Sequence, residues 1–176
     1  DWAFSQKELP SIAPHQNDIF ERIARGGFPE PFGRKPARRT PWFQSYIRTL
    51  LERDVRDLAN IEGITQLPRV LKVIASGAGA TLNVSTLSRE TGIAHTTISR
   101  YIDLLKALYL VETVPAWSAD LEVRLARTPK AYLVDSGLSC FLCNLDASSL
   151  MNDEVAFSRQ LEVFIANELV QECSVV

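Results

Sequence analysis

Short polar side chains cluster with a histidine and an arginine over residues 95–100, and these residue types suit contact with nucleic acid. The cluster contains His95, Thr96, Thr97, Ser99 and Arg100. Hydroxyl groups can hydrogen-bond to base edges, and an arginine can bind a guanine edge or a backbone phosphate. Such groups at the start of a helix are typical of the recognition helix of a helix-turn-helix protein. The sequence therefore indicates a candidate DNA-binding site at these five residues.

The surrounding pattern predicts a helix-turn-helix that would hold this cluster at the surface. Residues 82–91 can form a short helix, which Gly92 would end because glycine readily adopts the backbone conformation of a tight turn. A second helix follows, and its apolar residues recur at three- and four-residue spacing, as expected of a helix with one buried face. These residues are Ile98, Tyr101, Ile102, Leu105 and Leu108.

A β-wing is expected after the second helix. The β-rich run 109–114 stops at Pro115, as the first strand of a wing would, and the apolar runs 123–125 and 131–134 should return it. Arg124, Arg127 and Lys130 flank these runs. We include Arg124 and Arg127 among the candidate DNA-binding residues, since cations on a wing can reach the phosphate backbone.

The charge of this module leaves a second interpretation open, because many winged helices are protein–protein docking units. Residues 83–108 carry three cations and two acids, which gives a net of one positive charge with His95 neutral. A dedicated DNA-binding domain usually presents a strongly basic face. Because fold alone does not fix function, DNA binding and docking of a partner protein both stay hypotheses here.

The composition is that of an ordinary globular chain with unevenly distributed charge. It has 176 residues, 46% of them hydrophobic and 23% charged, and its net charge of −2 excludes a polybasic nucleic-acid binder. Four cations lie close together at Arg34, Lys35, Arg38 and Arg39, whereas acids prevail over residues 146–176. The basic cluster could contact nucleotide or nucleic-acid phosphates. We favour the alternative, a solvated link between helices.

The sequence predicts neither a membrane protein nor a metalloprotein. No apolar run approaches the roughly 20 residues that a membrane helix needs, and the N-terminal residues lack a signal-peptide pattern, so we expect a cytoplasmic protein. The odd cysteine count, Cys140, Cys143 and Cys173, fits reduced thiols better than disulfides. Cys140 and Cys143 have C-x-x-C spacing, but a zinc site needs two further ligands, for which only scattered candidates exist.

No arrangement of residues indicates catalysis. The chain has no G-x-x-x-x-G-K-[ST] motif, so it is expected to lack a loop that cradles ATP phosphates. A triad built on His95 would need a nucleophile-elbow sequence, which is absent. We therefore predict no catalytic residues, no cofactor and no enzymatic activity for this chain.

Periodicity along the whole chain predicts a mainly α-helical protein in three regions. Residues 1–63 should form a helical N-terminal region, residues 64–135 the winged helix-turn-helix, and residues 136–176 a set of C-terminal helices. The expected elements are a helix near 17–25, a Pro- and Arg-rich connector over 28–41, a helix over 42–60, a helix over 67–76, a short helix over 136–144, a polar loop over 146–153, and a helix over 154–173.

Several short motifs occur in order along residues 22–169. They are Gly26-Gly27-Phe28-Pro29-Glu30, Trp42 with Ser45-Tyr46-Ile47, Glu52-Arg53-Asp54-Val55, Leu82-Asn83-Val84-Ser85-Thr86-Leu87, Ile98-Ser99-Arg100-Tyr101, Thr128-Pro129-Lys130-Ala131-Tyr132-Leu133-Val134-Asp135-Ser136-Gly137-Leu138, and Leu161-Glu162-Val163-Phe164-Ile165-Ala166-Asn167-Glu168-Leu169. Together they resemble the domain of unknown function DUF4143, which follows the nucleotide-binding core of prokaryotic AAA-type (AAA_14-like) ATPases.

This resemblance implies that the chain is a fragment. The P-loop domain, with its ATP and Mg²⁺, would precede Asp1, and residues 1–63 would be the end of an ATPase lid. The last helix would open a restriction-endonuclease-like fold, to whose metal site only Glu162 could contribute, although we favour a surface role for this acid. The partners implied are double-stranded DNA and the missing ATPase domain, and an oligomer is compatible with the resemblance.

Overall fold

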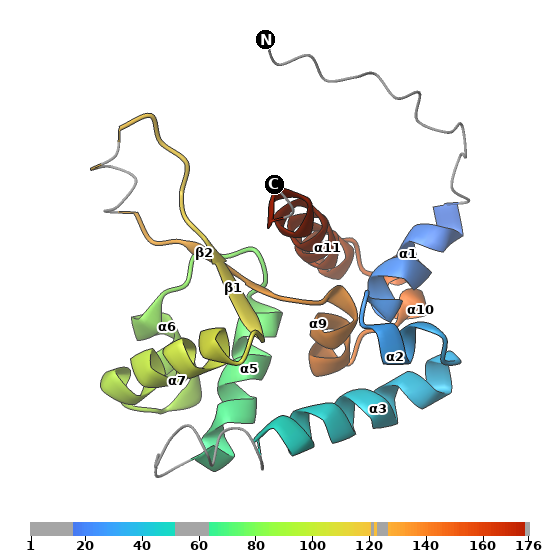
Figure 1. Cartoon of the computed structure of the whole chain (residues 1–176), viewed down its shortest axis with the longest axis horizontal. Coiled ribbons are helices and arrows are strands. Elements are labelled where there is room, and N and C mark those ends of the chain that lie inside the picture. Colours follow the sequence, from blue (N-terminus) through green and yellow to red (C-terminus); the bar gives the residue numbers. More distant parts are fainter. Residues whose placement is uncertain (1–15, 52–63, 121, 123–126, 175–176) are drawn as a thin grey trace.

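The computed structural model describes residues 16–51, 64–120, 122 and 127–174, and this part of the chain is mainly helical. Two short strands, β1 (Val111–Val114) and β2 (Lys130–Leu133), pair antiparallel and put Val111 opposite Leu133. The sheet lies between the N-terminal and C-terminal groups of helices in the sequence and near the middle of the view in Figure 1. The predicted fold class, mainly helical with a small central sheet, is confirmed.

The N-terminal region contains three helices, α1 (Gln16–Arg25), α2 (Pro29–Phe32) and α3 (Pro36–Thr49). The connector expected over 28–41 is therefore wrong. Pro36 occupies the first turn of α3, where a missing N–H costs nothing, and the exposed Pro41 removes only one hydrogen bond inside the helix. Arg38 and Arg39 consequently lie on α3, and the part of the expected helix after residue 51 lies outside the described residues until residue 64.

The central region has the order of elements of a winged helix. A 3₁₀ turn, η2 (Ile64–Gln66), leads into α5 (Leu67–Ser76), which is followed by α6 (Val84–Thr91) and α7 (His95–Ala107). The Asn83 side chain caps α6 by accepting a hydrogen bond from the Thr86 N–H at 3.0 Å, and Gly92 ends it with φ of 70°. An isolated bridge between Thr81 and Lys130 adds a third chain segment beside β1 and β2. The expected strand over 123–125 lies outside the described residues.

Three helices complete the chain, α9 (Ser136–Cys143), α10 (Ala147–Asn152) and α11 (Glu154–Ser174). The polar loop expected over 146–153 is wrong, because α10 occupies it. Asp146 caps α10 by accepting a hydrogen bond from the Ser149 N–H at 2.7 Å, and Leu150 supplies a buried anchor. With one capping residue and one buried apolar residue, α10 has no repeating apolar pattern by which a helix could be recognised in the sequence. None of the described helices combines the length and apolar character needed to cross a bilayer.

Helix α9 lies at the centre of the packing, in contact with α1, α3, α5, α11 and β2 (Figure 1). Its residues 136–140 are all buried. The larger core cluster joins α3, α5, α6, α7 and the sheet to Leu138 of α9, and a second cluster joins Cys140 to Ile23 of α1 and Leu150 of α10. The domain boundaries expected at residues 63 and 135 stay predictions. The larger core cluster contains residues from both sides of each boundary.

The start of α9 is held against the end of α1 by Asp135. This carboxylate, only 5% exposed, accepts hydrogen bonds from the Leu138 N–H at 2.7 Å and the Gly27 N–H at 2.6 Å. Burial raises the pKa of Asp135, while the backbone N–H groups that bind it act in the opposite direction. A Cβ at Gly26, where φ is 72°, would overlap the Asp135 carboxylate, and one at Gly137 would overlap the carbonyl group of Arg25. The glycines at positions 26 and 137 therefore allow the end of α1 and the start of α9 to lie in close contact.

We expect Gly137→Ala to destabilise the fold by about 1–3 kcal/mol, because the new methyl group meets backbone atoms of Arg25 that cannot rotate away. Gly33→Ala is the matched control, since an added Cβ at that exposed position meets nothing within 4 Å. Urea unfolding followed by circular dichroism would measure both differences. Equal stability of the two variants would contradict the close packing of α1 against α9.

Candidate nucleic-acid interface

The N-terminal end of α7 is held at the surface because the other face of the helix is buried. Ile98, Tyr101 and Leu105 are each 1% exposed or less and belong to the larger core cluster. Of the five candidates, His95, Thr96 and Arg100 are exposed, whereas Thr97 and Ser99 are partly buried. The Ser99 hydroxyl donates to the His95 carbonyl group at 3.2 Å, so it is partly satisfied within the helix. The accessible groups are therefore an imidazole, a hydroxyl and a guanidinium on adjacent turns.

The wing adds cations and an aromatic ring near the sheet. Arg127 is exposed, and it lines a cavity of about 480 Å³ together with Lys130 and Trp117. Trp117 is 83% exposed, which is unusual for so large an apolar side chain. Trp117 comes three positions after the end of β1, behind Pro115 and Ala116. Because the sequence predicts a wing here, an aromatic residue at this position could have been recognised as a candidate for the site. Arg124, the other predicted wing residue, lies outside the described residues.

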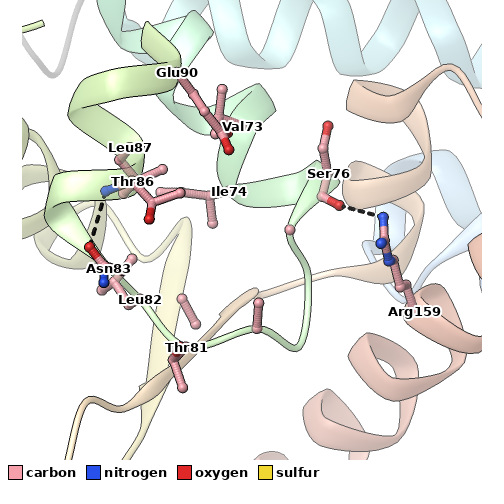
Figure 2. Close-up of a pocket in the computed structure, with 13 residues that line it drawn as sticks. Val73, Ile74, Ser76, Thr81, Leu82, Asn83, Thr86, Leu87, Glu90 and Arg159 are labelled. Carbon is pink, nitrogen blue, oxygen red and sulfur yellow. Dashed lines mark hydrogen bonds between the residues drawn. The ribbon is translucent and has the colours of Figure 1, made fainter.

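A larger cavity of about 540 Å³ is lined by residues of α5, α6 and the segment between them, and Figure 2 shows the side chains around it. Aliphatic residues such as Val73, Ile74 and Leu87 form much of its wall. Two of its polar side chains are already engaged, since Asn83 caps α6 and Arg159 of α11 donates to the Ser76 carbonyl group at 3.2 Å. Because its wall is largely aliphatic, this cavity offers little for specific recognition of a small polar ligand.

The basic cluster lies at the start of α3 and in the segment between α2 and α3, away from α7. Arg39 forms an ion pair with Glu21 at 2.7 Å, and Arg34 lies 3.6 Å from Glu30. Lys35 and Arg38 are exposed. The N-terminal end of α3 and the N-terminal end of α7 lie on opposite sides of the view in Figure 1. The structure therefore does not bring the two predicted sets of cations together, and intramolecular carboxylates already partner half of the basic cluster.

Glu162 connects α11 to the sheet. Its Oε1 atom accepts hydrogen bonds from the Lys130 ammonium group at 2.7 Å and from the Tyr132 hydroxyl at 2.9 Å. Partial burial opposes ionisation, but these two hydrogen bonds hold the pKa of Glu162 below its usual value. A Cβ at Gly79, where φ is 77°, would overlap this carboxylate. Glu162 thus has a packing role, which residue types alone could not indicate because its partners lie about 30 positions away.

Two of the three cysteines can be placed. Cys140 is buried and Cys143 is partly buried on α9, and burial raises the pKa of both thiols. A raised pKa disfavours the reactive thiolate, so neither thiol has the environment of a nucleophile or a redox centre. Within the described ranges, no three His, Cys, Asp or Glu side chains are grouped in a way that could hold a metal ion. The Cys173 side chain lies outside the described residues.

We expect Glu162→Gln to lower the free energy of unfolding by about 0.5–1 kcal/mol at neutral pH, a magnitude limited by the solvent exposure of the pair. Because the pKa of Glu162 is lower in the folded protein, its contribution is present above the ordinary value of 4.5 and is lost as the pH falls through the lowered value. The difference between the two proteins should therefore shrink below about pH 4.5. Urea unfolding from pH 7 to pH 3.5 would measure it, and a difference that does not change with pH would refute the assignment.

Comparisons with known proteins identify the family of the chain. Residues 16–149 match the family described as "Domain of unknown function (DUF8612)". The chain is also 30% identical over 146 residues to uncharacterized proteins of Mycobacterium tuberculosis and Mycobacterium bovis. That alignment covers 82% of this chain and 33% of each relative, so the chain spans about a third of their length. No solved structure matches the chain significantly.

The match corrects the resemblance to DUF4143, which is wrong because the family found is a different one. The motifs behind that resemblance include Gly26-Gly27 and Asp135-Ser136-Gly137, whose residue types follow from the close packing around Asp135. An ATPase core and a nuclease-like fold were expected from that resemblance alone, and nothing in the relatives' names bears on either. Because the match spans most of the chain, the protein belongs to the DUF8612 family.

Proposed function

We propose that the central module binds double-stranded DNA, with the start of α7 in the major groove and the wing beside it. The observation that supports this most is the exposure of His95, Thr96 and Arg100 on the first turns of a helix whose opposite face is fixed in the core. The major groove of B-DNA admits one α-helix and presents donors and acceptors that such side chains can read.

The helix end itself favours an anionic partner. Ala94 precedes α7 and offers no side-chain cap to the first N–H groups of the helix, although its carbonyl group accepts from the Thr97 N–H at 3.0 Å. These N–H groups carry the positive end of the helix dipole, which favours a phosphate oxygen nearby. Arg100 and the wing residue Arg127 add two exposed full charges. We therefore assign base contacts to the hydroxyl and imidazole groups, and phosphate contacts to the arginines and the helix end.

The small number of cations predicts modest affinity. Lys130 lies on the wing side but forms an ion pair with Glu162, which reduces its value for a phosphate. With about two or three phosphates neutralised, the logarithm of the binding constant should fall by about 0.9 per phosphate for each tenfold rise in salt. The runner-up function is docking of a partner protein, which the exposure of Tyr109 at 80% and Trp117 at 83% favours. Such docking would depend only weakly on salt.

Titration of labelled duplex DNA with the full chain, followed by fluorescence anisotropy over a salt series, tests the proposal. We expect saturable binding that weakens with salt, and we expect Arg100→Ala to weaken it by about 1–2 kcal/mol. Arg127→Ala should weaken it less and reduce the salt slope by about one unit.

Arg48→Ala is the matched control, because it removes one exposed positive charge from α3, outside the winged helix. It should bind DNA as the unaltered chain does. The absence of saturable binding at low salt would contradict DNA binding and favour the docking function. Equal losses from Arg48→Ala and Arg100→Ala would show that any cation suffices, and would contradict a role for α7 as recognition helix.

A further inference from the structure

A small cavity of about 140 Å³ lies where α1, the start of α9 and α11 meet. Arg22 and Arg25 of α1 line it together with Asn167 of α11 and Ser136 of α9. Neither arginine has a described carboxylate within 4.0 Å, unlike Arg34 and Arg39 of the basic cluster. Two guanidinium groups without a described carboxylate partner therefore border one cavity, and this arrangement belongs neither to α7 nor to the wing.

Aromatic rings support both arginines. The Cζ atom of Arg25 lies 3.9 Å from the centre of the Phe32 ring, and that of Arg22 lies 5.7 Å from the centre of the Phe164 ring. A guanidinium group that lies over a ring face keeps its N–H donors at its edge, where they remain free for an acceptor. The rings thus restrict both side chains without consuming their hydrogen bonds, which lowers the entropy lost when a ligand binds.

Two of the residues that line this cavity carry a buried polar atom without a partner. Arg25 Nε and Asn167 Nδ2 are both buried and have no hydrogen-bond acceptor among the described residues. A buried donor that lacks an acceptor destabilises the fold, and a charged donor does so more strongly. Both groups can only donate, so the missing partner must be an acceptor, and an anion would satisfy them best.

The two acids beside the cavity do not fill this role. Both oxygens of Asp135 already accept backbone N–H groups, from Gly27 and Leu138. Glu168, on α11, is exposed and makes no ion pair with a described cation within 4.0 Å. The volume corresponds to about four or five water molecules at about 30 Å³ each, which suits a single phosphate group.

We infer that this cavity binds a phosphate group, free or as the end of a small phosphate monoester, between Arg22, Arg25 and Asn167. Arginine suits this ligand because its planar fork can donate two parallel hydrogen bonds to phosphate oxygens. Since α1 lies inside the residues that match the family and α11 begins after them, the bound anion would fasten α11 to the family domain.

Isothermal titration calorimetry of the full chain with inorganic phosphate, in a buffer of constant ionic strength, tests this inference. A second arm uses glycerol 3-phosphate, so that tighter binding of the ester identifies a monoester as the preferred source. We expect saturable binding, and we expect Arg22→Gln and Arg25→Gln each to weaken it about tenfold or more, since a charge-assisted pair is lost. The Arg22 side chain is exposed, so its replacement should leave the fold intact. Circular dichroism checks each variant.

Two controls separate this site from the proposed DNA-binding site. Arg48→Gln removes an exposed positive charge elsewhere and should leave phosphate binding unchanged, as should Arg100→Ala on α7. Asn167→Leu removes the amide donor with similar bulk and should weaken phosphate binding without a change in net charge. The inference is overturned if neither phosphate nor the ester binds saturably, or if folded Arg22→Gln and Asn167→Leu bind as tightly as Arg48→Gln does.

Discussion

The carboxylate of Asp135 is the contact on which the arrangement of the helices depends. It satisfies one N–H at the start of α9 and one just after α1, and so joins two segments that are 108 positions apart in the sequence. Removing this carboxylate would leave buried N–H groups without an acceptor on both sides. Since α9 contacts α1, α3, α5, α11 and β2, its position determines where the N-terminal helices sit relative to the winged helix.

Capping residues and the spacing of apolar residues predicted those helices whose ends and buried faces depend on neighbouring residues in the sequence. The bounds of α6 follow from Asn83 and Gly92, and the buried face of α7 follows from the spacing of its apolar residues. The same reasoning failed where prolines begin and continue α3, because proline was taken as a sign of a loop although the first turn of a helix accepts it. It also missed α10, whose stability comes from a cap and one buried leucine.

The candidate sites were predictable to different degrees. The five residues on α7 are neighbours in the sequence, so a pattern over six positions contains them all. The contact of Glu162 with Lys130 and Tyr132 depends on how α11 crosses the sheet, and the cavity joins α1 residues to an asparagine about 140 positions later. Tertiary packing brings these residues together, and their spacing in the sequence does not indicate that they are neighbours. The family match likewise replaced a resemblance built in part on Gly26-Gly27 and Asp135-Ser136-Gly137, whose residue types close packing explains.

The burial of α9 also determines how this protein can be divided into pieces for study. The helix is enclosed by partners on several sides, and residues 136–140 have almost no contact with water. An excised winged helix that ended at residue 135 would expose the apolar surface of α5 that α9 now covers. It would also retain Asp135 but lose the Leu138 N–H that this carboxylate binds. A fragment that contains the winged helix therefore needs α9 to keep this surface of α5 covered, because newly exposed core residues favour aggregation.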